Sequence, residues 1–138
     1  MMHVKHLDHI NLTVANFEET ADWYRRVFGF EVVERGIDSE RKPWGVLRSG
    51  DALLCIYERP DFRFEGYSAQ VGKRVHAMAH FGLRITDRAK WLETIGREKV
   101  KCTYSDFRYP HSNSWYVIDP TGWEIEVALW DGDAVAFK

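Results

Sequence analysis

Cysteine and proline are both scarce in this chain of 138 residues, which has two of the former and four of the latter. Cys55 and Cys102 lie far apart and form no CxxC pair, which argues against a disulfide framework and a structural zinc site. No apolar stretch approaches the ~20 residues of a membrane span, and the first residues lack the apolar run of a secretion signal. We therefore expect a cytoplasmic protein with no membrane partner.

An excess of charge of one sign is also missing. Nineteen basic and twenty-one acidic residues give a formal charge of −2, and the signs are interleaved along the chain. Such a chain has no field that attracts phosphate backbones, so no nucleic-acid partner is expected. Hydrophobic residues make up 45% of the sequence, which is too apolar for disorder and enough for one compact domain.

The sequence does contain an internal repeat with an offset of 71 residues. The matched segments are strand-like: 9–14 with 80–85, Trp44–Leu47 with Trp115–Ile118, and 52–56 with 123–127. One offset that serves three segments indicates two copies of one module. We place the modules at about 5–58 and 76–129, with a linker at about 59–75 and a short tail at 130–138.

Each module begins with alternating apolar and polar residues, the pattern of a half-buried strand, and continues with an amphipathic helix. Asn16 and Asp87 are placed to cap the two helices, which are predicted to end at Gly29 and Gly96. Three strands are predicted after each helix, at 30–37, 44–48 and 52–58 in the first module and at 100–104, 114–118 and 123–129 in the second. Each module is thus predicted as βαβββ, which makes the fold α+β.

Strand alternation also predicts which side chains share the sheet face opposite the helix. His9, Cys55, His80 and Glu126 fall on that face, and the repeat pairs His9 with His80 and Cys55 with Glu126. If the two modules meet around a pseudo-twofold axis, two imidazoles and a carboxylate form a site for a divalent metal with open coordination positions. The alternative is that each histidine is a hydrogen-bonded strand residue without a ligand role.

Four motifs give the chain a resemblance to the vicinal oxygen chelate superfamily, from Leu7 to about Ala128. They are Leu7–Ile10, Ala21–Phe30, His80–Ile85 and Ser114–Glu126. The superfamily includes glyoxalase I, fosfomycin and bleomycin resistance proteins and extradiol dioxygenases. The resemblance implies two βαβββ modules in a cupped mixed sheet, the glyoxalase-like fold, around a divalent metal held by His9, His80 and Glu126. It also implies a small-molecule substrate and a homodimer.

The reaction depends on the other residues of the face. Cys55 stands where glyoxalase I carries a second carboxylate, which weakens a glyoxalase interpretation. Fosfomycin thiol transferases are similar in this cysteine and in a tyrosine like Tyr116, but an ungapped match gives Asp106 and Val135 where they place a lysine and an arginine, and Asn11 replaces their threonine. Extradiol dioxygenases are similar in the His, His, Glu set and in Tyr116.

We therefore predict a metalloenzyme acting on a small molecule with adjacent oxygens, and favour extradiol-type dioxygenase chemistry with Fe(II). Thiol transfer or lyase and isomerase chemistry with Mn, Ni or Zn is the alternative, followed by a non-catalytic drug-binding protein of the bleomycin-resistance type. Tyr116 and His111 are the candidate catalytic residues, and Asn11, Cys55 and Arg84 the candidate substrate-binding residues. Tyr116 would instead lie in the core if its hairpin register shifted by one residue.

Overall fold

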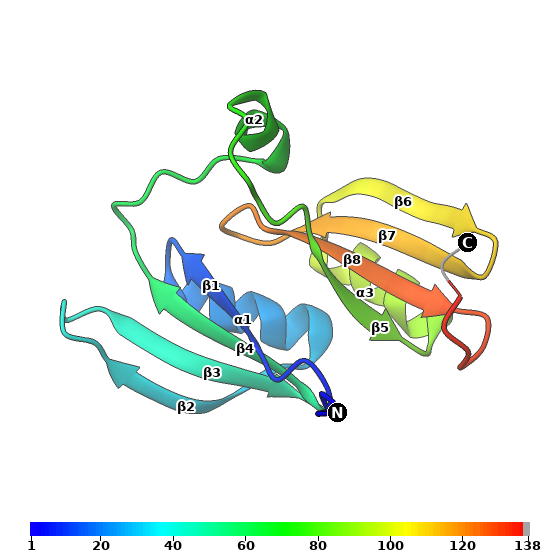
Figure 1. The fold of residues 1–138 in the computed structure, drawn as a ribbon, viewed down its shortest axis with the longest axis horizontal. Coiled ribbons are helices and arrows are strands. Elements are labelled where there is room, and N and C mark those ends of the chain that lie inside the picture. Colours follow the sequence, from blue (N-terminus) through cyan, green and yellow to red (C-terminus); the bar gives the residue numbers. More distant parts are fainter. Residues whose placement is uncertain (137–138) are drawn as a thin grey trace. The chain divides into compact units, whose positions relative to one another are not determined.

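The computed structural model describes residues 1–136 and divides the chain into two units, Met1–Phe62 and a second that begins at Arg63. The division lies inside the segment predicted as a linker. Both units have the predicted βαβββ order (Figure 1). Unit 1 contains β1 (Ile10–Val14), α1 (Phe17–Phe28), β2 (Glu31–Ile37), β3 (Pro43–Ser49) and β4 (Ala52–Glu58); unit 2 contains α2 (Tyr67–Gly72), β5 (Phe81–Ile85), α3 (Arg88–Glu98), β6 (Cys102–Tyr109), β7 (Ser112–Ile118) and β8 (Glu124–Trp130).

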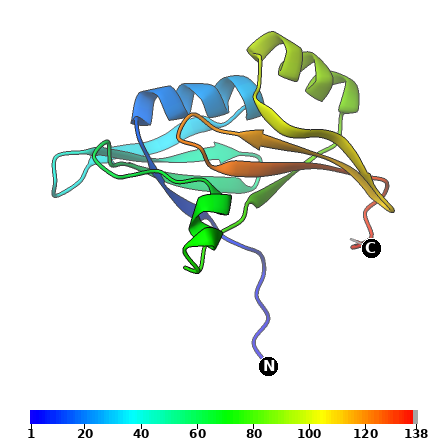
Figure 2. The ribbon, with the colours of Figure 1, turned by 90° about the horizontal axis from the view of Figure 1, so that it is seen from above.

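The sheet of unit 1 has the strand order β1-β4-β3-β2, with β1 parallel to β4 and the other pairs antiparallel. Figure 2 shows α1 against one face of this sheet, where Leu12, Val14 and Tyr24 are buried. Asn16 caps the helix by accepting a hydrogen bond from the Glu19 N–H, 2.8 Å away. Gly29 ends it in the left-handed conformation, with φ 70°. Both predicted ends of α1 are confirmed.

The sheet of unit 2 repeats the topology as β5-β8-β7-β6, and α3 lies against one face of this sheet. Asp87 caps α3 as predicted, but the helix does not end before Gly96. It continues to Glu98, and Lys99 adopts the left-handed conformation with φ 50°. The left-handed residue directly precedes Val100, the next buried side chain, so the chain leaves the helix three residues after Gly96. Gly96 is exposed within the helix.

The strand β6 is longer than the predicted segment 100–104. It runs to Tyr109, with register shifts on either side of Tyr104, and Asp106 has φ 54°. These irregularities interrupt the period-two alternation by which a strand is recognised in a sequence. The linker also holds a short helix, α2, which was not predicted and which buries none of its residues.

The pairing of β3 in unit 1 and of β7 in unit 2 corrects the alignment of the two repeats. Trp44 pairs with Tyr57, whereas Trp115 pairs with Val127, so the two tryptophans are not equivalent. Gly45 is the counterpart of Trp115, because β3 and β7 are related by an offset of 70 rather than 71. Five residues lie between the paired Ile118 and Glu124, whereas four lie between the equivalent pair Arg48 and Leu53. Asp119 stabilises the longer turn. The carboxylate of Asp119 accepts hydrogen bonds from the N–H groups of Thr121, Gly122 and Trp123 at 2.8 to 2.9 Å.

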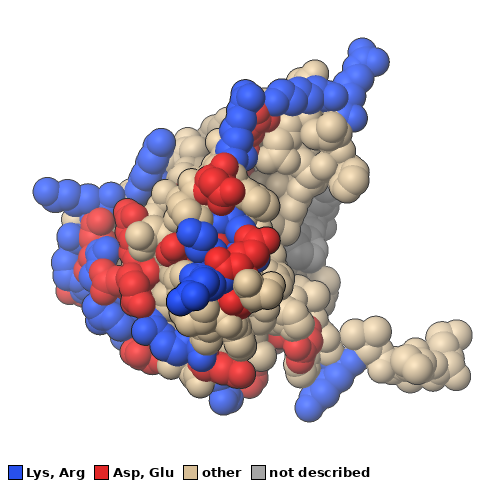
Figure 3. All heavy atoms as spheres, turned by 90° about the vertical axis from the view of Figure 1, so that its left-hand side faces the viewer, with Lys and Arg blue, Asp and Glu red and all other residues tan. Residues whose placement is uncertain are grey.

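Charged side chains of both signs intermingle on the face that Figure 3 shows. Among residues 1–136, no helix is long and apolar enough to cross a membrane.

Candidate functional site

The predicted residues that the structure brings into contact lie in unit 2, on the sheet face opposite α3. We call this surface the open face of unit 2. His80 immediately precedes β5, and the parallel pairing of β5 with β8 places Gly82 beside Glu126. The Nε2 atom of His80 lies 3.0 Å from Oε2 of Glu126, and 33% and 20% of the two side chains are exposed. An imidazole nitrogen and a carboxylate oxygen therefore converge at a position that solvent reaches.

Ser114 fixes the second oxygen of this carboxylate. Its hydroxyl donates a 2.8 Å hydrogen bond to Oε1 of Glu126, and the serine is fully buried. Because a hydrogen bond holds one oxygen, the other is left for His80 or for a ligand. Ser114 was not among the predicted site residues, although alternation along β7 places it on the same face as Tyr116. Glu124, whose Oε1 lies 3.7 Å from Nδ1 of His80, was also missed.

Tyr116 stands beside this pair. It is paired with Glu126 in the register of β7 and β8, so its side chain lies on the open face and not in the core. Its ring meets the His80 ring edge-on at a centroid distance of 5.4 Å, and its hydroxyl lies 2.7 Å from that of Tyr109. Burial, the hydrogen bond with Tyr109 and the charge of Glu126 raise the pKa of Tyr116 well above its usual value. The phenol is therefore a neutral hydrogen-bond donor at physiological pH.

Arg84 lies further along the same face. It faces the same side of the sheet as Gly82 and His80, because every second residue of a strand does so. Its guanidinium lies 3.6 Å from the centre of the Trp130 ring, at the end of β8. Arg84 is exposed, as expected for a residue that binds a solute.

His9, Asn11 and Cys55 belong to unit 1. The register pairs Asn11 with Cys55, so both lie on the sheet face opposite α1, the open face of unit 1. His9 precedes β1, is exposed, and places Nδ1 2.7 Å from a carboxylate oxygen of Asp8. Burial, with smaller contributions from Asp8 and Glu34, raises the pKa of the Cys55 thiol, so Cys55 is a neutral side chain near pH 7.

His111 is not brought to Tyr116. It is exposed in the turn between β6 and β7, and its backbone oxygen accepts a hydrogen bond from the Asp131 N–H. Tyr116 lies five positions further along the chain, which at the spacing of a strand is about 16 Å. The two predicted catalytic residues therefore cannot exchange a proton directly.

The donor atoms of the open face of unit 2 fit part of a metal site. Imidazole and carboxylate ligands together suit Fe(II), Mn(II), Ni(II) and Zn(II). His80 and Glu126 supply one of each, while His9 belongs to the other unit. Within residues 1–136, no group of three or more His, Cys, Asp or Glu side chains is assembled to hold a metal ion.

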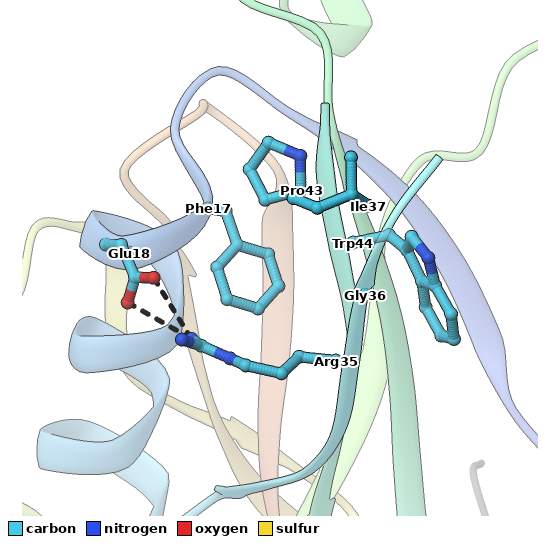
Figure 4. Close-up of a pocket in the computed structure, with 7 residues that line it drawn as sticks. All are labelled: Phe17, Glu18, Arg35, Gly36, Ile37, Pro43 and Trp44. Atoms are coloured by element: carbon cyan, nitrogen blue, oxygen red, sulfur yellow. Dashed lines mark hydrogen bonds and ion pairs between the residues drawn. The ribbon is translucent and has the colours of Figure 1, made fainter. Parts of the chain in front are cut away.

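A pocket of about 190 Å³ lies elsewhere in unit 1. Figure 4 shows it between the start of α1 and the strands β2 and β3, with Arg35 reaching across to Glu18. Its lining residues are Phe17, Glu18, Arg35, Gly36, Ile37, Pro43 and Trp44, none of which was predicted to bind metal or substrate.

Solved structures with the same fold cover nearly the whole chain. A glyoxalase family protein from Enterococcus faecalis matches with a TM-score of 0.75 and 17% identity over 92% of this chain and 99% of that one. The fosfomycin resistance protein FosX from Listeria monocytogenes has a TM-score of 0.71 and 18% identity, over 95% and 96% of the two chains. TnmS3, an antibiotic binding protein from Streptomyces sp. CB03234, has a TM-score of 0.68 and 16% identity, over 94% and 98%. At these identities the likeness shows the fold alone.

The family of the chain is shown by a match of its sequence to a family model. Residues 6–127 match the model of the Glyoxalase/Bleomycin resistance protein/Dioxygenase superfamily, which takes in both βαβββ modules except for the last strand's end. This chain belongs to that superfamily.

Proposed function

We propose that this protein is a divalent-metal-dependent enzyme acting on a small molecule with adjacent oxygens. The contact between Nε2 of His80 and Oε2 of Glu126 carries the proposal. It joins a nitrogen and an oxygen ligand in a half-exposed position, and the second carboxylate oxygen is already held by buried Ser114. Hydrogen-bonded support of a ligand carboxylate is the arrangement that metal sites use to orient their ligands. His9, in unit 1, stays the third ligand predicted from the sequence.

A metal bound there would act as a Lewis acid toward the substrate oxygens. The chain's own contribution comes from Tyr116, whose neutral hydroxyl lies on the same face as His80 and Glu126. It would donate a hydrogen bond to a substrate oxygen on which negative charge develops, and this stabilises the charge without moving a proton in advance. The two phenol oxygens lie 2.7 Å apart and either can be the donor, so Tyr109 would donate to the Tyr116 oxygen while Tyr116 donates to the substrate.

A single neutral donor suits a reaction that needs charge stabilisation at one oxygen, such as the opening of an epoxide by a thiol. We rank this reaction first. Extradiol-type ring cleavage with Fe(II) is the second candidate, favoured by the position of Tyr116 beside the His80–Glu126 pair. It also needs a second proton carrier, and the exposed position of His111 does not provide one.

Metal titration of the purified, chelator-treated protein tests the class of function. Isothermal titration with Mn(II), Ni(II) and Zn(II), and with Fe(II) under anaerobic conditions, should give one site per chain in the wild type. His80→Ala and Glu126→Gln should weaken it about 100-fold or more, because each removes a ligand. His111→Ala is the matched control and should leave the affinity unchanged. Equal binding by the wild type and His80→Ala would contradict the proposal.

Activity assays then separate the reactions. The metal-loaded protein is offered catechols with oxygen uptake as the readout, and epoxides with a thiol and hydroxycarbonyl compounds with product formation as the readout. Turnover that Tyr116→Phe reduces about 10- to 1,000-fold supports an enzymatic role for the hydroxyl. Tight binding of such compounds without turnover in any arm would identify a binding protein instead.

A further inference from the structure

The pair of Arg84 and Trp130 is a second feature of the open face of unit 2. Arg84 lies in β5 and Trp130 ends β8, and their side chains meet with the guanidinium 3.6 Å from the ring centre. A guanidinium placed over an aromatic ring is attracted by the ring electrons and keeps the N–H groups at its edge available as donors. The stacking therefore orients Arg84 without using up its hydrogen bonds.

Arg84 also differs from its neighbours in having no acidic partner. Arg88 pairs with Asp106, Arg97 with Glu98 and Arg108 with Asp131. No carboxylate among residues 1–136 forms an ion pair with Arg84, which is exposed in the middle of a strand. An oriented, uncompensated cation on the face that carries His80 and Glu126 is suited to an external anion.

We propose that Arg84, held on Trp130, is a specificity residue that binds an oxyanion of the substrate, either a carboxylate or a phosphoryl group. Two parallel hydrogen bonds from a guanidinium fit the geometry of both groups. This inference rests on the proposed function for the rest of the substrate, because His80 and Glu126 mark the end at which the adjacent oxygens would bind. The anion subsite itself is formed within unit 2 alone.

Strand geometry sets the length of such a substrate. Gly82 lies beside Glu126 and Arg84 beside Ala128, so the Arg84 backbone is two residues further along the sheet, or about 7 Å. The side chain leans on Trp130, which is four residues beyond Glu126 and thus about 13 Å away along β8. The substrate should carry its anionic group roughly 10 Å from its adjacent oxygens.

The subsite can be tested without any metal. In metal-free protein labelled with nitrogen-15, the Arg84 Nε–H resonance, identified by its absence in Arg84→Lys, is followed during titration with inorganic phosphate and with acetate. It should shift saturably with at least one anion, and Trp130→Leu should weaken the binding several-fold. The resonance of Arg97, which has an acidic partner, is the internal control. An Arg84 shift no larger than that of Arg97 with both anions would overturn the proposal.

A matched pair of compounds tests the length. Caffeate has a catechol at one end and a carboxylate at the other, and its primary amide has the same shape without the charge. The metal-loaded wild type should bind caffeate about tenfold more tightly than the amide, and Arg84→Gln should abolish this preference while Arg97→Gln keeps it. Equal binding of acid and amide by the wild type would overturn the assigned spacing. If metal binding itself fails, the proposed function fails, whereas the phosphate and acetate titration still decides the subsite.

Discussion

The two units share one fold but carry different chemistry on their open faces. Glu126, Tyr116 and Gly82 of unit 2 correspond to Cys55, Val46 and Asn11 of unit 1. A carboxylate and a phenol thus stand in one copy where a thiol and an aliphatic side chain stand in the other. Equivalent positions of the two units thus direct their side chains to the same face of the sheet, while the side chains themselves differ in chemistry.

The cores differ as well, and the differences compensate. Gly45 of unit 1 has no side chain, and a Cβ there would lie 2.8 Å from the Phe17 ring, which occupies the space. In unit 2 the counterpart of Gly45 is Trp115, which is fully buried and packs on Trp91. Arg88 stands in place of Phe17, and its guanidinium lies 5.3 Å from the centre of the Trp115 ring. One large ring is supplied by the helix in unit 1 and by the sheet in unit 2.

The largest expected effect is a difference in stability between variants of Trp44 and Trp115, which the sequence repeat aligns with each other. Trp115→Ala should lower the free energy of unfolding by about 3–5 kcal/mol, because it leaves a cavity in a sealed core. Trp44→Ala should cost about 1–2 kcal/mol, because Trp44 is half-buried and stacks on Tyr57 at a centroid distance of 5.9 Å. Urea unfolding followed by circular dichroism measures both. Equal losses would mean that the two tryptophans are equivalent after all.

A methyl group added at Gly45, the counterpart of Trp115, tests whether unit 1 has room for a side chain at this position. Gly45→Ala should destabilise the protein by about 1–3 kcal/mol, because the new Cβ would lie 2.7 Å from the backbone oxygen of Glu34. Gly82→Ala is the control on the open face of unit 2, where the nearest atom is 3.9 Å away. It should change stability by less than about 0.5 kcal/mol. Thermal unfolding of both variants gives the comparison, and a tolerated Gly45→Ala would show that both the Glu34 backbone and the Phe17 ring can move aside.

Removal of the hydroxyl from Ser114 tests whether the hydrogen bond to Glu126 supports metal binding on the open face of unit 2. Ser114→Ala should weaken metal binding about tenfold, since the carboxylate of Glu126 loses its support. Ser112→Ala, in the same strand and also buried, should leave the affinity within about twofold. Calorimetric titration with one of the metals measures both. An unchanged affinity in Ser114→Ala would show that the orientation of Glu126 does not depend on this hydrogen bond.

The smallest effect is spectroscopic. Because the pKa of folded Tyr116 is raised, its phenol should stay protonated through the pH range near 10 in which an ordinary tyrosine ionises. Tyr116→Phe should therefore leave the absorbance rise at 295 nm unchanged in folded protein. In urea, where the burial is lost, the same variant should lose about one sixth of the rise, because the chain has six tyrosines. Loss of that share in the folded protein would contradict the raised pKa.

The raised pKa of Tyr116 also determines how this residue makes the stability of the protein depend on pH. A phenol with a higher pKa in the folded than in the unfolded state stabilises the fold fully below about pH 10, and this contribution is lost as the pH rises further toward the folded pKa. Tyr116 therefore contributes no pH dependence of stability near neutrality.

Sequence patterns were sufficient where a segment obeys one simple rule. The alternation in β1 and β4 correctly separates buried Leu12 and Ile56 from the residues of the open face. The cap residues Asn16 and Gly29 likewise predict α1. The βαβββ order follows from such local signals together with the repeat, whereas the family was predicted from the resemblance of four motifs.

The remaining features depend on structure that the sequence pattern does not encode. The extra residue in the turn at Asp119 shifts β7 by one position, so an ungapped repeat misaligned Trp44 with Trp115. The roles of Ser114 and Tyr109 arise from contacts between neighbouring strands, which a single segment cannot reveal. His111 looked suitable by its residue type and its place before Tyr116, but strand geometry separates the two.

Anomalous diffraction from crystals grown with Mn(II) would show whether His80 and Glu126 hold a metal. We expect one strong anomalous peak within about 2.3 Å of both Nε2 of His80 and an oxygen of Glu126, with Ser114 still bonded to the other carboxylate oxygen. A peak at another carboxylate cluster, or none at this pair at saturating metal, would contradict it.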